Sequence, residues 1–149
     1  LAHVASHQGI LVADHIAKKP TERRIEDSSI PKAVYCEPQV ASFGLTEQQA
    51  QAKGLTVQVS RFPYRGCGKA VAIGKPEGFV KLVADSRTRE MLGASIVGIQ
   101  ATEIIHELLL AKTAELVPED IMRTVHAHPT FSETAMEASR GLFDKAIHV

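Results

Sequence analysis

The sequence is poor in cysteine and has no excess of charge of either sign. Its 149 residues contain two cysteines, Cys36 and Cys67, too few for a disulfide framework or a four-cysteine zinc site. The 17 basic and 17 acidic side chains give a formal net charge of zero. This balance argues against a protein that coats nucleic acid or an anionic membrane.

Long apolar runs and a signal peptide are also missing. A membrane-spanning helix needs about 18 or more consecutive apolar residues, and no such run occurs in this sequence. We therefore expect a soluble, cytoplasmic protein without a membrane partner. The first residue is Leu1 rather than methionine, and it lies in a predicted helix. We therefore expect this chain to be a piece of a longer protein.

No loop of the sequence has the glycine spacing that holds a phosphate. Gly66-Cys67-Gly68 supplies two glycines, but Val71 occupies the position of the third glycine of a dinucleotide fingerprint. Neither Gly-Lys pair is followed by serine or threonine, as a phosphate-binding loop requires. The sequence therefore predicts that this chain contains no nucleotide-binding domain.

The hydrophobic pattern divides the chain at a polar linker. Residues 1–18 have apolar residues at helical spacing, and Gly9 within them predicts close packing against a neighbour. The linker covers residues 18–24, so the predicted units are residues 1–24 and 25–149. Strands are expected at residues 32–36, 40–43, 55–62, 79–84 and 91–97, the last two as a hairpin. Helices are expected at residues 47–53, 101–116, from Pro118 and after Pro129. This order predicts an α+β domain with a mainly antiparallel sheet flanked by helices.

The histidines are the main candidates for chemistry near neutral pH. His3 and His7 have a spacing that suits a metal, but no third ligand is predicted nearby, and we expect no metal site. His128 precedes Pro129, which disfavours helical backbone at His128 and holds it at a bend. Glu133 follows one helical turn into the next element, where it would fix the imidazole tautomer and leave the other nitrogen as a base.

The motif that contains Glu133 has a simpler alternative interpretation. Thr130-Phe131-Ser132-Glu133 is also a capping box, in which Glu133 only satisfies the backbone at a helix start. Spacing alone favours this capping role for Glu133, although the two roles are compatible.

Cys36 falls in a predicted strand and is expected to be buried. Cys67 falls in a predicted loop between two glycines, where an exposed, reactive thiol is the less favoured alternative.

The motif His126-Ala127-His128-Pro129-Thr130-Phe131-Ser132-Glu133 resembles the carboxy-terminal signature of the dihydrolipoamide dehydrogenase family of flavoprotein disulfide reductases. Residues 1–5 with Gly9 resemble the helix that ends the FAD-binding region of that family. Residues 30–47 resemble the start of its dimerisation domain, and residues 78–98 resemble its central hairpin. The resemblance covers nearly all of the chain. It departs at Arg89, where the hairpins often carry glycine.

The resemblance implies the dimerisation-domain fold of the FAD- and NAD-linked reductases for residues 25–149, with the tail of the FAD-binding domain in residues 1–24. It implies a homodimer in which one subunit supplies the flavin and a redox disulfide, and the other supplies His128 as the base, oriented by Glu133. Leu1, Ala2 and His3 match the segment that lines the flavin.

FAD and NAD are implied for the full-length enzyme only. We expect no cofactor on this chain alone, and we expect the chain alone to be inactive. The implied reaction is reoxidation of dihydrolipoamide with NAD, with lipoyl domains of 2-oxoacid dehydrogenase complexes as partners. Two alternatives stay open: another disulfide reductase, similar to glutathione reductase, and a stand-alone dimerisation module without activity.

Overall fold

The computed structural model describes residues 1–20 and 24–148, so part of the predicted linker, residues 21–23, lies outside the described residues. The strands are β1 (Lys32–Val34), β2 (Val40–Gly44), β3 (Val57–Pro63), β4 (Phe79–Asp85) and β5 (Met91–Val97). The α-helices are α1 (Ala2–Ile16), α2 (Glu47–Ala52), α3 (Gly68–Ala72), α4 (Ala101–Thr113), α5 (Pro118–Arg123) and α6 (Glu133–Gly141). Two 3-10 turns are η1 (Asp27–Ser29) and η2 (Tyr64–Gly66).

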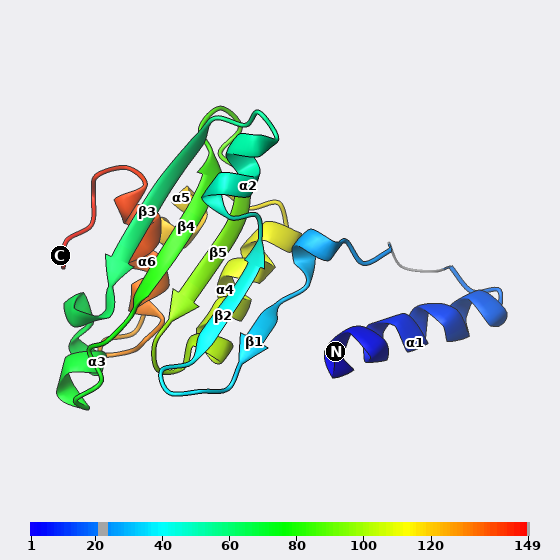
Figure 1. Ribbon diagram of the computed structural model, residues 1–149, viewed down its shortest axis with the longest axis horizontal. Helices are drawn as coiled ribbons and strands as arrows, with labels where there is room; N and C mark the ends of the chain where they lie inside the picture. Colours follow the sequence, from blue (N-terminus) through cyan, green and yellow to red (C-terminus); the bar gives the residue numbers. More distant parts are fainter. Residues whose placement is uncertain (21–23, 149) are drawn as a thin grey trace.

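The five strands form one antiparallel sheet in the order β1-β2-β5-β4-β3 (Figure 1). β4 and β5 are the predicted hairpin and occupy the middle of the sheet with β2. Helices α4 and α6 cover one face of the sheet, as Figure 1 shows. The predicted α+β architecture with an antiparallel sheet flanked by helices is therefore confirmed.

The core lies between the sheet and these two helices. Leu82 on β4 and Ile96 on β5 belong to one hydrophobic cluster with Ile105 and Leu108 of α4, and all four side chains are fully buried. Each such side chain stabilises the fold by about 1.5–3 kcal/mol through removal of apolar surface from water. Leu116, expected on the same helical face, lies beyond the end of α4 and is exposed.

Helix α2 packs on the other face of the sheet, at one end. Its predicted capping box is present: the Gln49 N–H donates to Thr46 Oγ1 over 3.2 Å, and the Thr46 N–H donates to Gln49 Oε1 over 2.9 Å. Ala50 is buried against Val83 and Leu92, and this contact closes a second small cluster.

Helix α1 projects away from the sheet (Figure 1), and none of its residues is buried. The ring Nε2 of His3 lies 3.0 Å from the carbonyl oxygen of Pro31, just before β1. A methyl group at Gly9 would meet no atom within 4 Å among the described residues. The expectation that Gly9 packs closely against a neighbour is therefore wrong within this chain.

The expectation for Cys36 is wrong, and the less favoured alternative for Cys67, an exposed thiol, is excluded. Val34 pairs with Val40, so β1 ends before Cys36, and this residue lies in the connecting loop with an exposed side chain. Cys67 is buried because the expected loop is instead η2 followed by the short helix α3, which the sequence did not predict.

Arg89 occupies the left-handed region with φ of 68°, a conformation that the family's usual glycine adopts without strain. Its guanidinium carbon lies 4.9 Å from the centre of the Phe143 ring, and one nitrogen lies 3.6 Å from Glu119 Oε1. These two contacts give the arginine a packing role that a glycine would lack.

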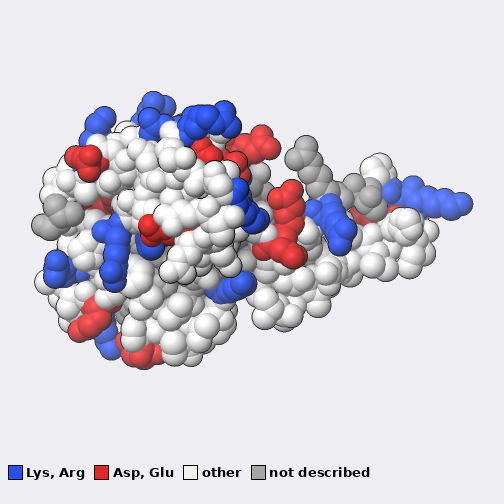
Figure 2. Space-filling model, turned by 45° about the horizontal axis from the view of Figure 1, so that its top comes forward, with Lys and Arg blue, Asp and Glu red and all other residues white. Residues whose placement is uncertain are grey.

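Charged side chains of both signs are interspersed over the face shown in Figure 2, in keeping with the zero net charge. Within residues 1–20 and 24–148, no helix combines the length and hydropathy needed to cross a bilayer.

Candidate functional site

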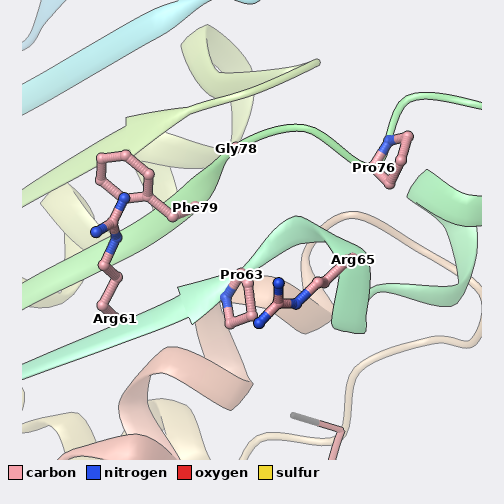
Figure 3. Close-up of a pocket in the computed structure, with 6 residues that line it drawn as sticks. All are labelled: Arg61, Pro63, Arg65, Pro76, Gly78 and Phe79. Atoms are coloured by element: carbon pink, nitrogen blue, oxygen red, sulfur yellow. The ribbon is translucent and has the colours of Figure 1, made fainter.

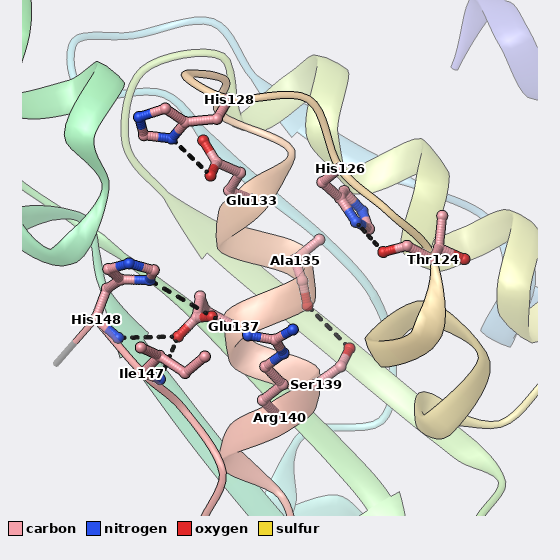
Figure 4. Close-up of polar contacts among 10 residues, drawn as sticks. All are labelled: Thr124, His126, His128, Glu133, Ala135, Glu137, Ser139, Arg140, Ile147 and His148. Carbon is pink, nitrogen blue, oxygen red and sulfur yellow. Dashed lines mark hydrogen bonds and ion pairs between the residues drawn. The ribbon is translucent and has the colours of Figure 1, made fainter.

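His128 lies in the segment that joins α5 to α6 (Figure 4). Helix α5 begins with Pro118 at its first turn, as predicted, and the Val117 N–H donates to Asp120 Oδ2 over 3.0 Å. The peptide bond between His128 and Pro129 is cis. The segment runs from the end of α5 at Arg123 to the start of α6 at Glu133.

His128 and Glu133 are in direct contact. Nδ1 of His128 lies 3.0 Å from Glu133 Oε1. Since an ionised carboxylate can only accept hydrogen bonds, Nδ1 is the donor and the proton of the neutral ring sits there. The His128 side chain is 74% exposed, whereas that of Glu133 is 16% exposed. Among the described residues, His128 Nε2 has no hydrogen-bond partner, so it is available to take a proton from an incoming group.

Glu133 also holds the backbone at the start of α6. The Thr130 N–H donates to Glu133 Oε2 over 2.8 Å, which is half of the predicted capping box. The other half, a bond from the Glu133 N–H to Thr130 Oγ1, is absent among the described residues, and the Thr130 hydroxyl donates to the Ala127 carbonyl oxygen over 2.7 Å. The same carboxylate therefore serves the helix start and the histidine, one oxygen each.

Glu133 carries its negative charge at neutral pH. Burial by itself would raise the pKa of its carboxyl, but the hydrogen bonds from the Thr130 N–H and the His128 ring outweigh burial. The pKa of Glu133 consequently lies below its ordinary value. A negative charge at this distance would stabilise a protonated imidazole at His128.

A distant segment forms one wall of the site. A methyl group at Gly68 would lie 3.6 Å from His128 Cε1, so the backbone of α3 passes beside the ring. The Cys67 thiol lies 3.4 Å from the Thr130 carbonyl oxygen, and the Phe131 ring stacks on Tyr64 with centroids 6.3 Å apart. Sequence reasoning missed this wall, because the glycines around Cys67 signalled only a possible loop.

His126, the other histidine of the motif, is buried and has partners at both ring nitrogens. Nε2 lies 2.7 Å from Glu107 Oε1 on α4, and Nδ1 lies 2.8 Å from the Thr124 carbonyl oxygen. No role was predicted for His126. The geometry leaves it without a free nitrogen, so His128 is the histidine of the motif that can act as a base.

The residues expected to line a flavin are far from His128 within one chain. Leu1, Ala2 and His3 lie at the start of α1, beyond the β1 edge of the sheet, whereas His128 lies beside α3 near the opposite edge (Figure 1). In the described part of the chain, no three histidine, cysteine or acidic side chains gather as a metal site would require.

A separate pocket of about 610 Å³ opens where β3 ends and β4 begins (Figure 3). The Arg61 guanidinium stacks on Phe79 at 4.0 Å from the ring centre. The residues that line this pocket are Arg61, Pro63, Arg65, Pro76, Gly78 and Phe79. This lining includes no histidine, cysteine or carboxylate, so the pocket offers no group that could remove a proton.

Comparison with known proteins identifies the family. The family described as pyridine nucleotide-disulphide oxidoreductase, dimerisation domain, matches residues 30–139. The chain belongs to this family. Dihydrolipoyl dehydrogenase of Corynebacterium glutamicum is 46% identical over 95% of this chain, and that of Bacillus subtilis is 42% identical over 99%. The chain spans 31% of the length of each of these relatives.

Two solved structures share the fold of this chain. LpdA from Mycobacterium tuberculosis superimposes with a TM-score of 0.87 at 24% identity, over 94% of this chain and 30% of that protein. The HOCl-induced flavoprotein disulfide reductase RclA from Escherichia coli gives a TM-score of 0.80 at 25% identity, over 87% of this chain and 30% of that protein. The resemblance found in the sequence and the fold it implied are both confirmed.

Proposed function

We propose that this chain is the C-terminal third of a flavoprotein that reoxidises dihydrolipoamide with NAD. In this proposal residues 1–24 end the FAD-binding domain and residues 25–149 form the dimerisation domain. The dihydrolipoyl dehydrogenase relatives support the choice of substrate. The observation that carries the proposal is the His128 ring, which is bound to the Glu133 carboxylate through one nitrogen and open to solvent at the other.

His128 acts as the base toward a thiol. Nε2 removes the proton from one thiol of dihydrolipoamide, and the resulting thiolate attacks a disulfide sulfur of the other subunit. A new sulfur–sulfur bond forms, and the displaced sulfur leaves as a thiolate. Glu133 keeps Nδ1 protonated and offsets the positive charge that His128 acquires. General-base help of this kind is worth about 10²–10⁴ in rate.

Dimerisation is needed because one chain separates the two halves of this site. The exposed His128 and the first residues of α1 lie near opposite edges of the sheet. A second copy related by two-fold symmetry would bring His128 to the flavin-lining residues of its partner. We therefore propose that the functional unit is a homodimer and that the isolated chain has no activity.

The start of α1 fits the flavin role given to Leu1, Ala2 and His3. Leu1 is the N-cap, no side chain caps the helix and no acidic side chain lies in the first turn, so the helix's unpaired N–H groups face an electron-rich acceptor favourably. FAD, if bound there, would supply the redox chemistry that couples oxidation of the substrate to reduction of NAD. NAD would bind outside this chain. Lipoyl domains of 2-oxoacid dehydrogenase complexes are the proposed partners, and the cytoplasm is the proposed location.

The proposal is tested with His128→Gln in the complete enzyme. We expect oxidation of dihydrolipoamide to fall by about 10²–10⁴, the value of a lost general base, with the flavin absorbance spectrum retained. The exposed His106 on α4 is the matched control, and His106→Gln is expected to behave as the parent protein. Near-normal turnover of His128→Gln contradicts the assignment. Preference for glutathione disulfide over dihydrolipoamide in a substrate panel would favour the alternative reductase.

A further inference from the structure

His126 is bound at both ring nitrogens by groups that only accept hydrogen bonds. Its side chain is 5% exposed, with Nδ1 facing the Thr124 carbonyl oxygen at 2.8 Å and Nε2 facing Glu107 Oε1 at 2.7 Å. A carbonyl oxygen and an ionised carboxylate have no hydrogen to give. With Glu107 ionised, both contacts are satisfied together only when each ring nitrogen carries a hydrogen.

We propose that His126 is a positioning residue: as an imidazolium paired with Glu107, it ties the segment that carries His128 to helix α4. The proton assignment follows from the hydrogen-bond partners alone. The consequence for catalysis rests on the function proposed above for His128.

The contact with α4 anchors a part of the segment that other contacts leave free. On the side of α6, Thr130 is bound to Glu133, to Ala127 and to the Cys67 thiol. All of these contacts lie at or beyond Ala127. Before Ala127, the described polar contacts join the segment to an element other than α5 only at His126, which bonds to Glu107 on α4. These contacts therefore hold the backbone on both sides of His128.

A fixed backbone matters here because the His128 ring itself is held by little else. The ring is mostly exposed, and Glu133 is its hydrogen-bond partner among the described residues. A base must be held within hydrogen-bond reach of the thiol proton, and misplacement by about 1 Å costs about 10²-fold in rate. Anchoring the segment at His126 thus holds His128 in position without using its reactive nitrogen.

Two substitutions of Glu107 separate the effect of its hydrogen bond to His126 from the effect of its negative charge. Glu107→Gln removes the charge but keeps an amide that can bond to Nε2 of a neutral His126. Glu107→Ala removes the tie and leaves a buried ring nitrogen without its partner. Glu103→Gln, an exposed position one turn earlier on α4, is the matched control.

The proton state is measured on the 149-residue chain with ¹⁵N-labelled histidine by NMR at neutral pH. We expect both ring nitrogens of His126 to show the chemical shifts of protonated nitrogen, in the parent chain and in Glu103→Gln. In Glu107→Gln one nitrogen should change to the shift of an unprotonated nitrogen. A single protonated nitrogen on His126 in the parent chain would overturn the proposal.

The positioning role is measured in the complete enzyme. For Glu107→Ala we expect kcat to fall about 10- to 100-fold, with KM for dihydrolipoamide and the flavin spectrum retained, and we expect Glu107→Gln to recover most of the loss. Equal kcat in Glu107→Ala and Glu103→Gln would overturn this role. Failure of the function proposed for His128 is recognised separately, since His128→Gln would then keep its turnover while the NMR result for His126 would stand.

Discussion

Glu133 and His128 should contribute very differently to stability, although they form one pair. Glu133→Ala removes the half-buried hydrogen bond to the Thr130 N–H, and a hydrogen bond to a charged group is worth about 1.5–3 kcal/mol. It also removes the contact with His128, worth about 0.2–1 kcal/mol because the ring is largely exposed. The sum is about 2–4 kcal/mol. His128→Gln removes only the second contribution.

Thermal unfolding followed by circular dichroism measures the difference. For a domain of this size 1 kcal/mol corresponds to about 2–4 °C in Tm, so Glu133→Ala should lower Tm by roughly 4–16 °C and His128→Gln by at most about 4 °C. His106→Gln supplies the baseline for loss of an exposed histidine. Equal losses for Glu133→Ala and His128→Gln would refute the conclusion that Glu133 serves the helix start as well as the histidine.

Three further predictions concern backbone fit, pH and thiol reactivity. Gly98→Ala should lower the free energy of unfolding by more than about 2 kcal/mol, since φ is 148° and the new methyl group would lie 2.6 Å from the Tyr64 ring; denaturant unfolding that matches the parent chain would contradict this. Because the pKa of Glu133 is lowered by folding, its stabilising contribution is complete above the unfolded value of about 4.5 and is lost as pH falls through the folded value; the stability difference between the parent chain and Glu133→Gln, measured by urea unfolding, should shrink below that pH and not above it. An alkylating reagent should modify Cys36 in the folded chain and spare the buried Cys67, and peptide mapping that finds Cys67 labelled first would show the opposite burial.

Local signals in the sequence were sufficient for most elements of the fold. The hairpin of β4 and β5, the capping box of α2 and the proline start of α5 each depend on residues within one turn or one strand pair. The pairing of His128 with Glu133 was predictable for the same reason, since five positions along one bend separate them. These features can be predicted without knowing which distant segments pack against them.

Contacts between distant segments were not predictable. Cys67 is buried because α3 packs beneath the segment that carries Thr130, and Gly68 lies beside His128 only in the folded chain. Likewise, the partner of His126 comes from α4, 19 positions earlier. No local pattern marks Glu107 as different from the other acidic residues of that helix. The contact between His128 and Glu133 was therefore predictable, whereas the contacts that support it were missed.

Subunit complementation tests the central claim, that His128 of one subunit serves the disulfide of the other. Two inactive variants of the complete enzyme are mixed under conditions that exchange subunits: His128→Gln, and a variant whose redox cysteines are replaced by serine. In a mixed dimer one of the two sites combines an intact disulfide with an intact His128, so an equal mixture should recover about a quarter of the parent activity. No recovery, with mixed dimers verified by native mass spectrometry, would contradict the claim.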